Sequence, residues 1–119
     1  MREIKFREFY KKENIMYRDI DISNECLPIH DNNVVIMQYT GLKDKNGVEI
    51  YEGDILELID WWDDSVSIHP VLYKNSAFMC QRLDDKEFPF FYLQGNDDLK
   101  DGYKIIGNIY ENPELLELE

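Results

Sequence analysis

The stretch MQYTGLKDKNGVEIYEGDIL, residues 37–56, alternates short apolar runs with glycines. Gly41, Gly47 and Gly53 stand six residues apart, which fits successive turns rather than a single phosphate-binding loop. Asn46-Gly47 is a strong hairpin signal, because a type I′ turn requires a positive φ at both central residues. The stretch therefore predicts a hairpin followed by the start of a further strand.

Residues 44–49 are rich in oxygen ligands, and a calcium loop is the alternative to a turn. An EF-hand loop needs glycine at its sixth position and a bidentate acid at its twelfth. Counted from Asp44, glycine falls at the fourth position and Ile55 at the twelfth. The flanking residues are strand-like as well, so the sequence predicts a turn, with no metal and no other cofactor.

Short apolar runs bounded by turn residues recur along the whole chain. Residues 3–9 alternate between polar and apolar side chains and predict a half-buried strand. Ile4 and Phe6 are expected to face the core. Lys5 and Arg7 are expected to face solvent. Further strands are expected in NIMYRDI, VVIMQYT, GVEIY, DILELI, SVSIHPVLY, AFMCQRL, EFPFFYL and YKIIGNIY.

Strands at this short spacing predict a mainly β fold, either a small, strongly bent sheet or an SH3-like barrel. EGDILELI would open this barrel and YKIIGNIY would close it. Residues 1–40 are expected to form an N-terminal β extension. Residues 41–119 are expected to form the compact barrel-like body, and the two parts together would make one structural unit.

Proline and glycine mark special positions in the predicted strands and at the end of the chain. Pro70 lies within SVSIHPVLY and predicts an edge strand or a bulge, because proline cannot donate to the ladder. Gly107 lies within YKIIGNIY, where a bulge or a close backbone approach is the usual reason for glycine. A short helix is predicted over 113–118, with Asn112 as its cap and Pro113 at its first position.

The net charge of -12 is unevenly distributed. Residues 1–18 hold six basic against three acidic side chains, and residues 19–119 hold seven basic against twenty-two acidic ones. The basic segment would lie against the acidic body and be partly neutralised there. Alternatively, the body offers an acidic surface to a basic partner or mimics nucleic-acid charge. Direct binding of DNA or RNA is disfavoured, because phosphate binding depends on Lys and Arg.

Two adjacent tryptophans, Trp61 and Trp62, lie among the acids Asp60, Asp63 and Asp64. Adjacent residues of an extended segment point to opposite sides. One ring would enter the core, and the other would be an exposed anchor for a protein partner with an acidic rim. The alternative is that both rings are packed inside.

Few residues in this chain suit catalysis or metal binding. Cys26 and Cys80 lie in unlike contexts and fit a reducing compartment, as apolar filler, and a disulfide between them is the less favoured alternative. His30 and His69 are the only histidines, so a zinc site has little to draw on. The acids of residues 84–101 leave open a small metal-dependent hydrolase. No run of eighteen apolar residues or secretory signal is present, which favours the cytoplasm over a membrane.

Three segments together resemble the YopX family, small proteins of bacteriophages and prophages. They are the stretch 37–56, REIKFR at 2–7 and IIGNIYENPELL at 105–116. The chain departs from the family where the first strand usually continues with a small residue and Trp, since it reads Glu8-Phe9-Tyr10. Residues 60–100 show little of the family pattern. The resemblance implies a phage-encoded protein in the cytoplasm of a bacterial host, with no catalytic residues to carry over.

The motif residues of the central stretch are expected to be structural, as turn formers and core edges. They are Tyr39, Thr40, Gly41, Leu42, Asp44, Asn46, Gly47, Tyr51, Gly53 and Asp54. The function expected from all of this is a non-enzymatic accessory protein that binds a host or phage protein through its acidic body and exposed aromatic residues. The metal-dependent hydrolase is the alternative, and self-association is left open.

Overall fold

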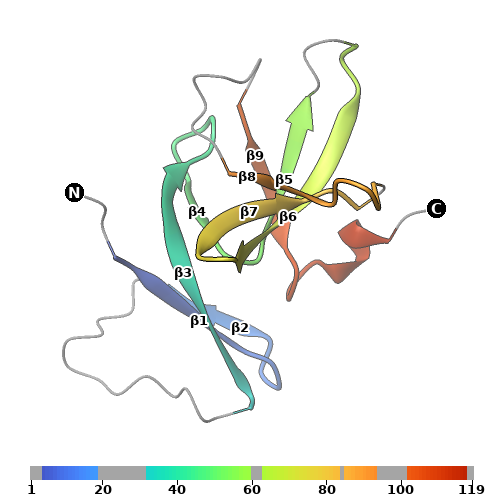
Figure 1. The fold of residues 1–119 in the computed structure, drawn as a ribbon. Coiled ribbons are helices and arrows are strands. Elements are labelled where there is room, and N and C mark those ends of the chain that lie inside the picture. Colours follow the sequence, from blue (N-terminus) through green and yellow to red (C-terminus); the bar gives the residue numbers. More distant parts are fainter. Residues whose placement is uncertain (1–3, 19–31, 60–62, 84, 94–101, 118–119) are drawn as a thin grey trace.

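The structure is a computed structural model that describes residues 4–18, 32–59, 63–83, 85–93 and 102–117 (Figure 1). The described residues are mainly β, which confirms the predicted fold class. Their elements are β1 (Phe6–Tyr10), β2 (Ile15–Tyr17), β3 (Val34–Lys43), β4 (Glu49–Tyr51), β5 (Asp54–Ile59), β6 (Val66–Lys74), β7 (Ala77–Gln81), β8 (Phe90–Tyr92), β9 (Lys104–Asn108) and the 3-10 helix η2 (Pro113–Leu116).

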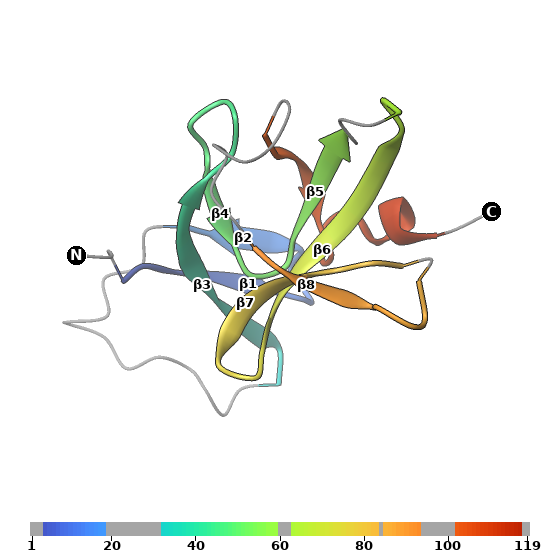
Figure 2. The ribbon, with the colours of Figure 1, turned by 45° about the horizontal axis from the view of Figure 1, so that its top comes forward.

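The strands form two antiparallel sheets. The first has the order β2-β1-β3-β4, and the second has the order β8-β7-β6-β5-β9. Figure 1 shows β1 and β2 at one end of the molecule and β5, β6 and β9 toward the other, and Figure 2 shows the second sheet curling into a half-barrel. β5 pairs with β9, so the segments EGDILELI and YKIIGNIY lie side by side as expected, but among the described residues the sheet stays open, with β8 and β9 at its two ends. β3 runs through residue 40, the expected boundary between the two parts.

The hydrophobic core lies inside the curl of the second sheet and against β4. Its fully buried members are Ile50, Leu56, Val71, Cys80 and Tyr103. Each of the three aliphatic side chains among them contributes roughly 1.5–3 kcal/mol by leaving water. The thiol of Cys80 is free, and burial raises its pKa to about 12, so the folded protein keeps it protonated, as expected of apolar filler. Cys26 lies outside the described residues.

The predicted faces of β1 are wrong. Ile4 is 64% exposed, whereas Arg7 is 1% exposed and Phe9 is 4% exposed. β1 is an inner strand, between β2 and β3. Phe9 stacks on Tyr110 at 5.4 Å between ring centroids. Arg7 lies two residues before Phe9 and therefore shares its strand face. The buried face of β1 thus contains Arg7 and Phe9, and not Ile4.

Pro70 lies in an inner strand, so the predicted edge position is wrong. β6 pairs with β5 through residues 66–70 and with β7 through residues 71–74, so the proline stands where the strand changes its partner. The carbonyl of Val71 accepts a hydrogen bond from the N–H of Gly53 and therefore points toward β5. Neighbouring residues of a strand direct their backbone groups to opposite sides, so the nitrogen of Pro70 faces β7.

A side chain supplies the donor that Pro70 lacks. Val71 pairs with Cys80, which places Gln81 opposite Pro70. The carbonyl of Gln81 lies 2.9 Å from Nδ1 of His69. A carbonyl only accepts, so Nδ1 carries the proton and donates it. The histidine ring thus makes the hydrogen bond to β7 that a proline nitrogen cannot make.

Gly107 has both features that its position predicts. The register between β5 and β9 shifts beside it, from Ile55 opposite Gly107 to Leu56 opposite Ile105, which is a bulge. A Cβ at Gly107 would also come within 2.6 Å of Oδ1 of Asn112. That oxygen accepts from the N–H of Asn108 at 3.2 Å.

The predicted C-terminal helix is shorter than expected. η2 is a single 3-10 turn with Pro113 in its first positions. Asn112 makes no side-chain cap, because its carbonyl oxygen is turned back to the N–H of Asn108. The acidic end of the segment gives the last turn no basic residue to favour a longer helix. Residues 118–119 lie outside the described part of the chain.

Candidate functional site

The residues predicted to contact a partner fall in and beside a region that the structure does not describe. Asp60, Trp61 and Trp62 lie outside the described residues. Asp63 is exposed, and its Oδ1 accepts from the N–H of Ser65 at 3.0 Å, a hydrogen bond that lowers the pKa of the carboxyl. Asp64 is exposed too, with a φ of 60°. A role of these residues in partner binding stays a prediction.

The acidic segment of the alternative hydrolase is described only in part, over residues 85–93. Oδ1 of Asp85 accepts from the N–H groups of Glu87 and Phe88 at 3.0 and 2.9 Å. This carboxylate therefore shapes its own turn. Among the described residues, no three His, Cys, Asp or Glu side chains come together in a way that could hold a metal ion.

The motif hairpin is closed by the side chain of Asp44. Its Oδ1 accepts from the N–H groups of Asn46 and Val48, both at 2.9 Å. The N–H of Gly47 donates to the Asp44 carbonyl at 3.0 Å, and Gly47 has a φ of 82°. Asn46 does not share the positive φ, so the predicted type I′ turn is wrong. The loop is a three-residue hairpin connection, in which only the last residue is left-handed.

Asp44 also fastens the hairpin to the second sheet. Its Oδ2 accepts from the N–H of Ile105 at 3.1 Å, and the N–H of Lys45 donates to the carbonyl of Tyr103 at 2.8 Å. Both carboxylate oxygens are thus bound to backbone donors, and the residue is 4% exposed. A cation would have to displace these hydrogen bonds, so the arrangement is that of a structural clamp.

The other motif residues join β3 to β4. The hydroxyl of Thr40 donates to the carbonyl of Ile50 at 2.8 Å and accepts from the N–H of Leu42 at 3.2 Å. The rings of Tyr39 and Tyr51 lie 5.6 Å apart. Gly41 and Gly53 both have positive φ, and a Cβ at Gly53 would come within 3.0 Å of Met37 Sδ.

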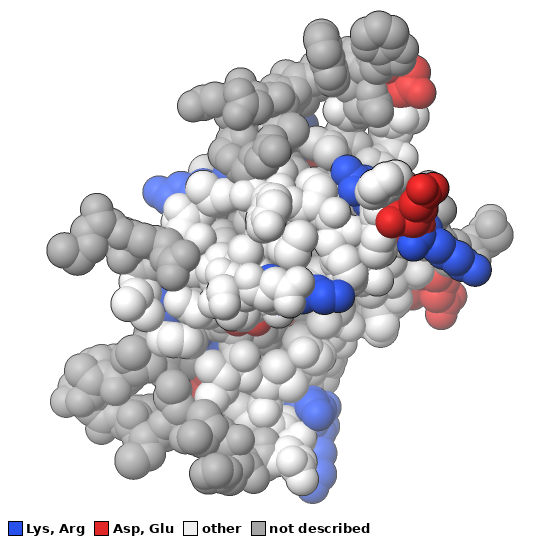
Figure 3. All heavy atoms as spheres, in the orientation of Figure 1, with Lys and Arg blue, Asp and Glu red and all other residues white. Residues whose placement is uncertain are grey.

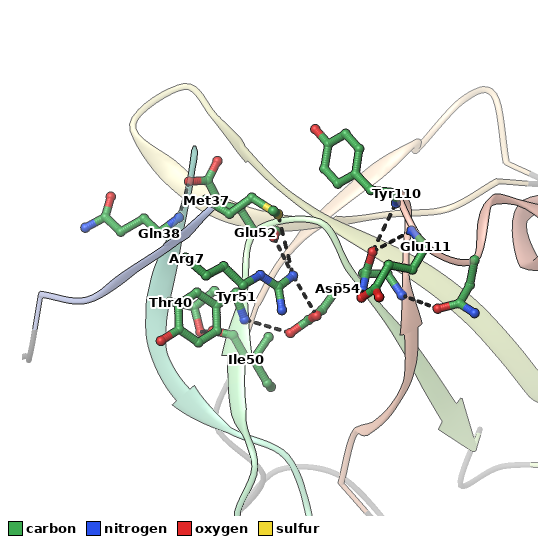
Figure 4. Close-up of polar contacts among 12 residues, drawn as sticks. Arg7, Met37, Gln38, Thr40, Ile50, Tyr51, Glu52, Asp54, Tyr110 and Glu111 are labelled. Atoms are coloured by element: carbon green, nitrogen blue, oxygen red, sulfur yellow. Dashed lines mark hydrogen bonds and ion pairs between the residues drawn. The ribbon is translucent and has the colours of Figure 1, made fainter. Parts of the chain in front are cut away.

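The strongest polar feature that sequence reasoning missed is a buried ion pair between the two sheets (Figure 4). Nη2 of Arg7, on β1, donates to Oδ1 of Asp54, on β5, at 2.9 Å. The two side chains are 1% and 3% exposed. Nη2 also donates to the carbonyl of Glu52 at 3.1 Å. Oδ2 of Asp54 accepts from the N–H of Tyr51 at 2.8 Å.

The electrostatics of this pair are dominated by burial. Burial raises the pKa of Asp54, and the charge of Arg7 offsets only part of this rise. Burial likewise lowers the pKa of Arg7, although Asp54 opposes the change. The guanidinium lies over the Tyr51 ring at 4.9 Å. Each charge therefore depends on the other, because little water reaches either of them.

A cavity of ≈ 240 Å³ opens beside the ion pair. Its walls come from β1, β4, β5, β9 and the end of the N-terminal hairpin. The lining residues are Arg7, Arg18, Val48, Glu49, Tyr51, Asp54 and Ile105. This cavity brings together segments from the start, middle and end of the chain, which no local pattern in the sequence indicates.

A second concave surface lies where β3 meets the β6–β7 hairpin and β8, and we call it the aromatic groove. It encloses ≈ 400 Å³ and is lined by Thr40, Leu42, Tyr73, Ser76, Ala77, Phe78, Tyr92 and Leu93. Tyr73 and Tyr92 are 53% and 66% exposed. Figure 3 shows that the side chains over β7 and β8 on this face are mainly uncharged. The groove therefore presents aromatic rings in a chain whose net charge is -12.

Ser67 and His69 have the separation of a nucleophile and its base, with Oγ and Nε2 2.8 Å apart. The hydroxyl also contacts the carbonyl of Leu58 at 3.4 Å, and the ring donates to the carbonyl of Gln81. These hydrogen bonds tie β6 to the strands on its two sides. Because these contacts lie where β6 changes its strand partner at Pro70, we assign Ser67 and His69 a structural role.

Comparison with known proteins agrees with the fold and motifs. The family model described as YopX protein matches residues 2–117. The crystal structure of protein EF1440 from Enterococcus faecalis is 34% identical, covers 98% of this chain and 100% of that one, and superposes with a TM-score of 0.70. Protein yopX from Bacillus subtilis is 17% identical, with 95% and 98% covered and a TM-score of 0.64, and shows the shared fold. No curated protein matches.

The protein is thus a half-barrel of antiparallel strands. The Asp44 hairpin and the Arg7–Asp54 pair hold its two sheets together. The chain belongs to the YopX family. Among the described residues, no helix has the length and apolar character needed to cross a membrane.

Proposed function

We propose that this protein is a phage- or prophage-encoded accessory protein that acts in the cytoplasm of a bacterial host by binding a protein of the host or of the phage. The aromatic groove is the observation that supports this function. Tyrosine is one of the residues enriched among the side chains that carry most of the binding energy at protein interfaces. Membership of the YopX family supports the phage association.

The contacts of the groove suit an extended segment of a partner. Tyr73 packs edge-on against Phe78 at 5.0 Å, which holds the two rings in place before any partner arrives. Tyr92 comes from β8, which is an edge strand of the second sheet among the described residues. An edge strand next to an apolar groove can pair with a partner's backbone while the groove takes its side chains.

The acidic body adds speed rather than affinity. With a net charge of -12, the protein would attract a basic partner at long range and accelerate encounter. Lys74, next to Tyr73 in the chain, lies over the ring of Phe90, with Nζ 3.8 Å from the centroid, and is not among the residues that line the groove. The partner we propose therefore presents an apolar extended segment with basic residues on its flanks.

The test is affinity capture from a bacterial host lysate with three versions of the protein. Tyr73→Ser and Tyr92→Ser, made together, remove the exposed rings of the groove. Tyr17→Ser is the matched control, because Tyr17 is 51% exposed on β2 in the other sheet. A protein retained by the wild type and by Tyr17→Ser, and lost with the groove variant, supports the proposal.

The strength of binding is then measured on the purified partner. Loss of an anchoring aromatic residue costs about 2 kcal/mol or more, so dissociation should accelerate by roughly thirtyfold. Asp63→Asn with Asp64→Asn should slow association and weaken its salt dependence if these acids form part of the rim. If the groove variant binds the same proteins with the same dissociation rate, the groove is not the contact surface. Capture of only the protein itself would mean self-association in place of a partner.

A further inference from the structure

The wall of the cavity beside the ion pair contains a buried donor without an acceptor. Arg7 uses Nη2 for its hydrogen bonds to Asp54, Glu52 and the sulfur of Met37. Its Nε is buried and has no hydrogen-bond partner among the described residues. An unsatisfied buried donor costs about 1–3 kcal/mol. An acceptor oxygen that reached Nε from the cavity would recover this cost.

A second guanidinium lies at the same cavity. Arg18 follows β2 and is exposed, and its side chain lines the cavity together with Arg7. Burial sets the direction of the pKa shifts of Arg7 and Asp54, and the charge of Arg18 is a smaller influence on each. Within the described part of the chain, no hydrogen bond or ion pair engages Arg18. The ion-paired Arg7 and the exposed Arg18 therefore line the same cavity.

The charges of the lining decide which ligand fits. The two arginines are balanced by Glu49 and Asp54, and the carboxylate of Glu49 is in turn bound by Nζ of Lys5 at 2.6 Å. The four charges of the lining cancel, and Lys5, which lies beside the lining, leaves one positive charge that a monovalent anion would neutralise. A divalent anion such as phosphate would leave an excess negative charge in a protein that already carries -12.

The remaining lining is apolar, with Val48, Ile105 and the ring of Tyr51. We propose that this cavity binds a small organic carboxylate, with its carboxylate group on Arg7 and Arg18 and a short apolar chain against Val48 and Ile105. The planar fork of a guanidinium matches the two oxygens of a carboxylate. The volume of ≈ 240 Å³ restricts the ligand to a short chain.

The experiment is a titration of the isotope-labelled protein, followed by backbone amide shifts in NMR spectra. Acetate, butyrate, inorganic phosphate and chloride are added at constant ionic strength. Butyrate should give saturable shifts at the amides of Glu49 and Ile105 and should bind roughly tenfold tighter than acetate, because its additional methylenes are buried. Chloride and phosphate should give weaker shifts without this preference.

Variants at exposed positions keep the test independent of folding. Arg18→Gln should weaken butyrate binding by about tenfold or more, because it removes a charge-assisted hydrogen bond. Val48→Trp should block the cavity, since Val48 is 52% exposed at its wall. Lys12→Gln is the matched control, an exposed cation in the turn of the same hairpin that does not line the cavity. The proposal is overturned if carboxylates give no saturable shifts, if Arg18→Gln binds butyrate like the control, or if phosphate binds as tightly as butyrate.

Discussion

Replacing Arg7 by Met should destabilise the protein far more than any exposed charge change. The substitution keeps the length of the side chain but leaves the Asp54 carboxylate, at 2% exposure, with only the N–H of Tyr51. A buried charge that loses its partner costs about 3–5 kcal/mol, a large part of the total of about 5–15 kcal/mol for a domain of this kind. Urea unfolding followed by circular dichroism measures this loss of unfolding free energy. The dependence of that free energy on urea concentration should stay unchanged.

The same variant carries a signature in pH. Burial already raises the pKa of Asp54, and removing the cation raises it further. A raised pKa in the folded state contributes stability that is present at low pH and is lost as the pH rises through that value. The loss caused by Arg7→Met should therefore grow as the pH rises above the ordinary Asp value of 3.8 toward the raised pKa, and Asp54→Asn in the same chain should recover part of it.

Lys5→Met is the matched control for this experiment. Lys5 forms an ion pair with Glu49 at 2.6 Å, but the two side chains are 32% and 26% exposed. Such a pair contributes at most about 1 kcal/mol. Equal losses for Arg7→Met and Lys5→Met, or a loss from Arg7→Met that does not change with pH, would refute the reasoning.

Four further outcomes are expected. Gly47→Val should cost roughly 1–3 kcal/mol through backbone strain alone, since nothing lies within 4 Å of a Cβ there; Gly47→Asn should cost less in thermal unfolding, because Asn tolerates a positive φ. His69→Ala should leave the carbonyl of Gln81 without its donor and cost about 1–3 kcal/mol of stability. Pro70→Val restores a backbone N–H, so it should be less harmful in the His69→Ala background than in the wild type. Additive effects of the two substitutions would contradict the idea that the His69 ring replaces the missing proline donor. Burial raises the pKa of Glu52 above its ordinary value of 4.5. The protonated residue therefore contributes stability at pH values below 4.5, and this contribution is lost as the pH rises through the raised pKa. Glu52→Gln should make the unfolding free energy, measured in urea titrations, depend less on pH. Excess calcium or EDTA should leave the melting temperature nearly unchanged, whereas a rise of many degrees with calcium would show a ligand of the folded state at the Asp44 hairpin.

Local patterns were sufficient to predict most strands and several special positions. The alternation in DILELI and the apolar run in VVIMQYT became β5 and β3, and the positive φ of Gly47 was predictable from its hairpin context. Gly107 was predictable too, as a bulge with a close neighbour. These features depend on residues that are near one another in the chain, so a short segment is enough to predict them.

The position of charges was not predictable in the same way. The alternation counted from Ile4 predicted that Arg7 faces solvent. This prediction failed because a charged side chain can be buried when a counterion pairs with it in the interior. The counterion, Asp54, comes from a strand 47 positions further along the chain. The edge position expected for Pro70 failed for a similar reason, since the histidine next to it replaces the missing donor.

The sequence by itself determined the mainly β class, the place of the motif hairpin, the family and the acidic charge of this protein. Only the tertiary structure decided which side chains are buried, and it alone assembled the Arg7–Asp54 pair, the cavity beside it and the aromatic groove. The physical reason is the range of the forces involved. Backbone preferences act within a few residues, whereas burial of a charge depends on what distant strands bring to the same place.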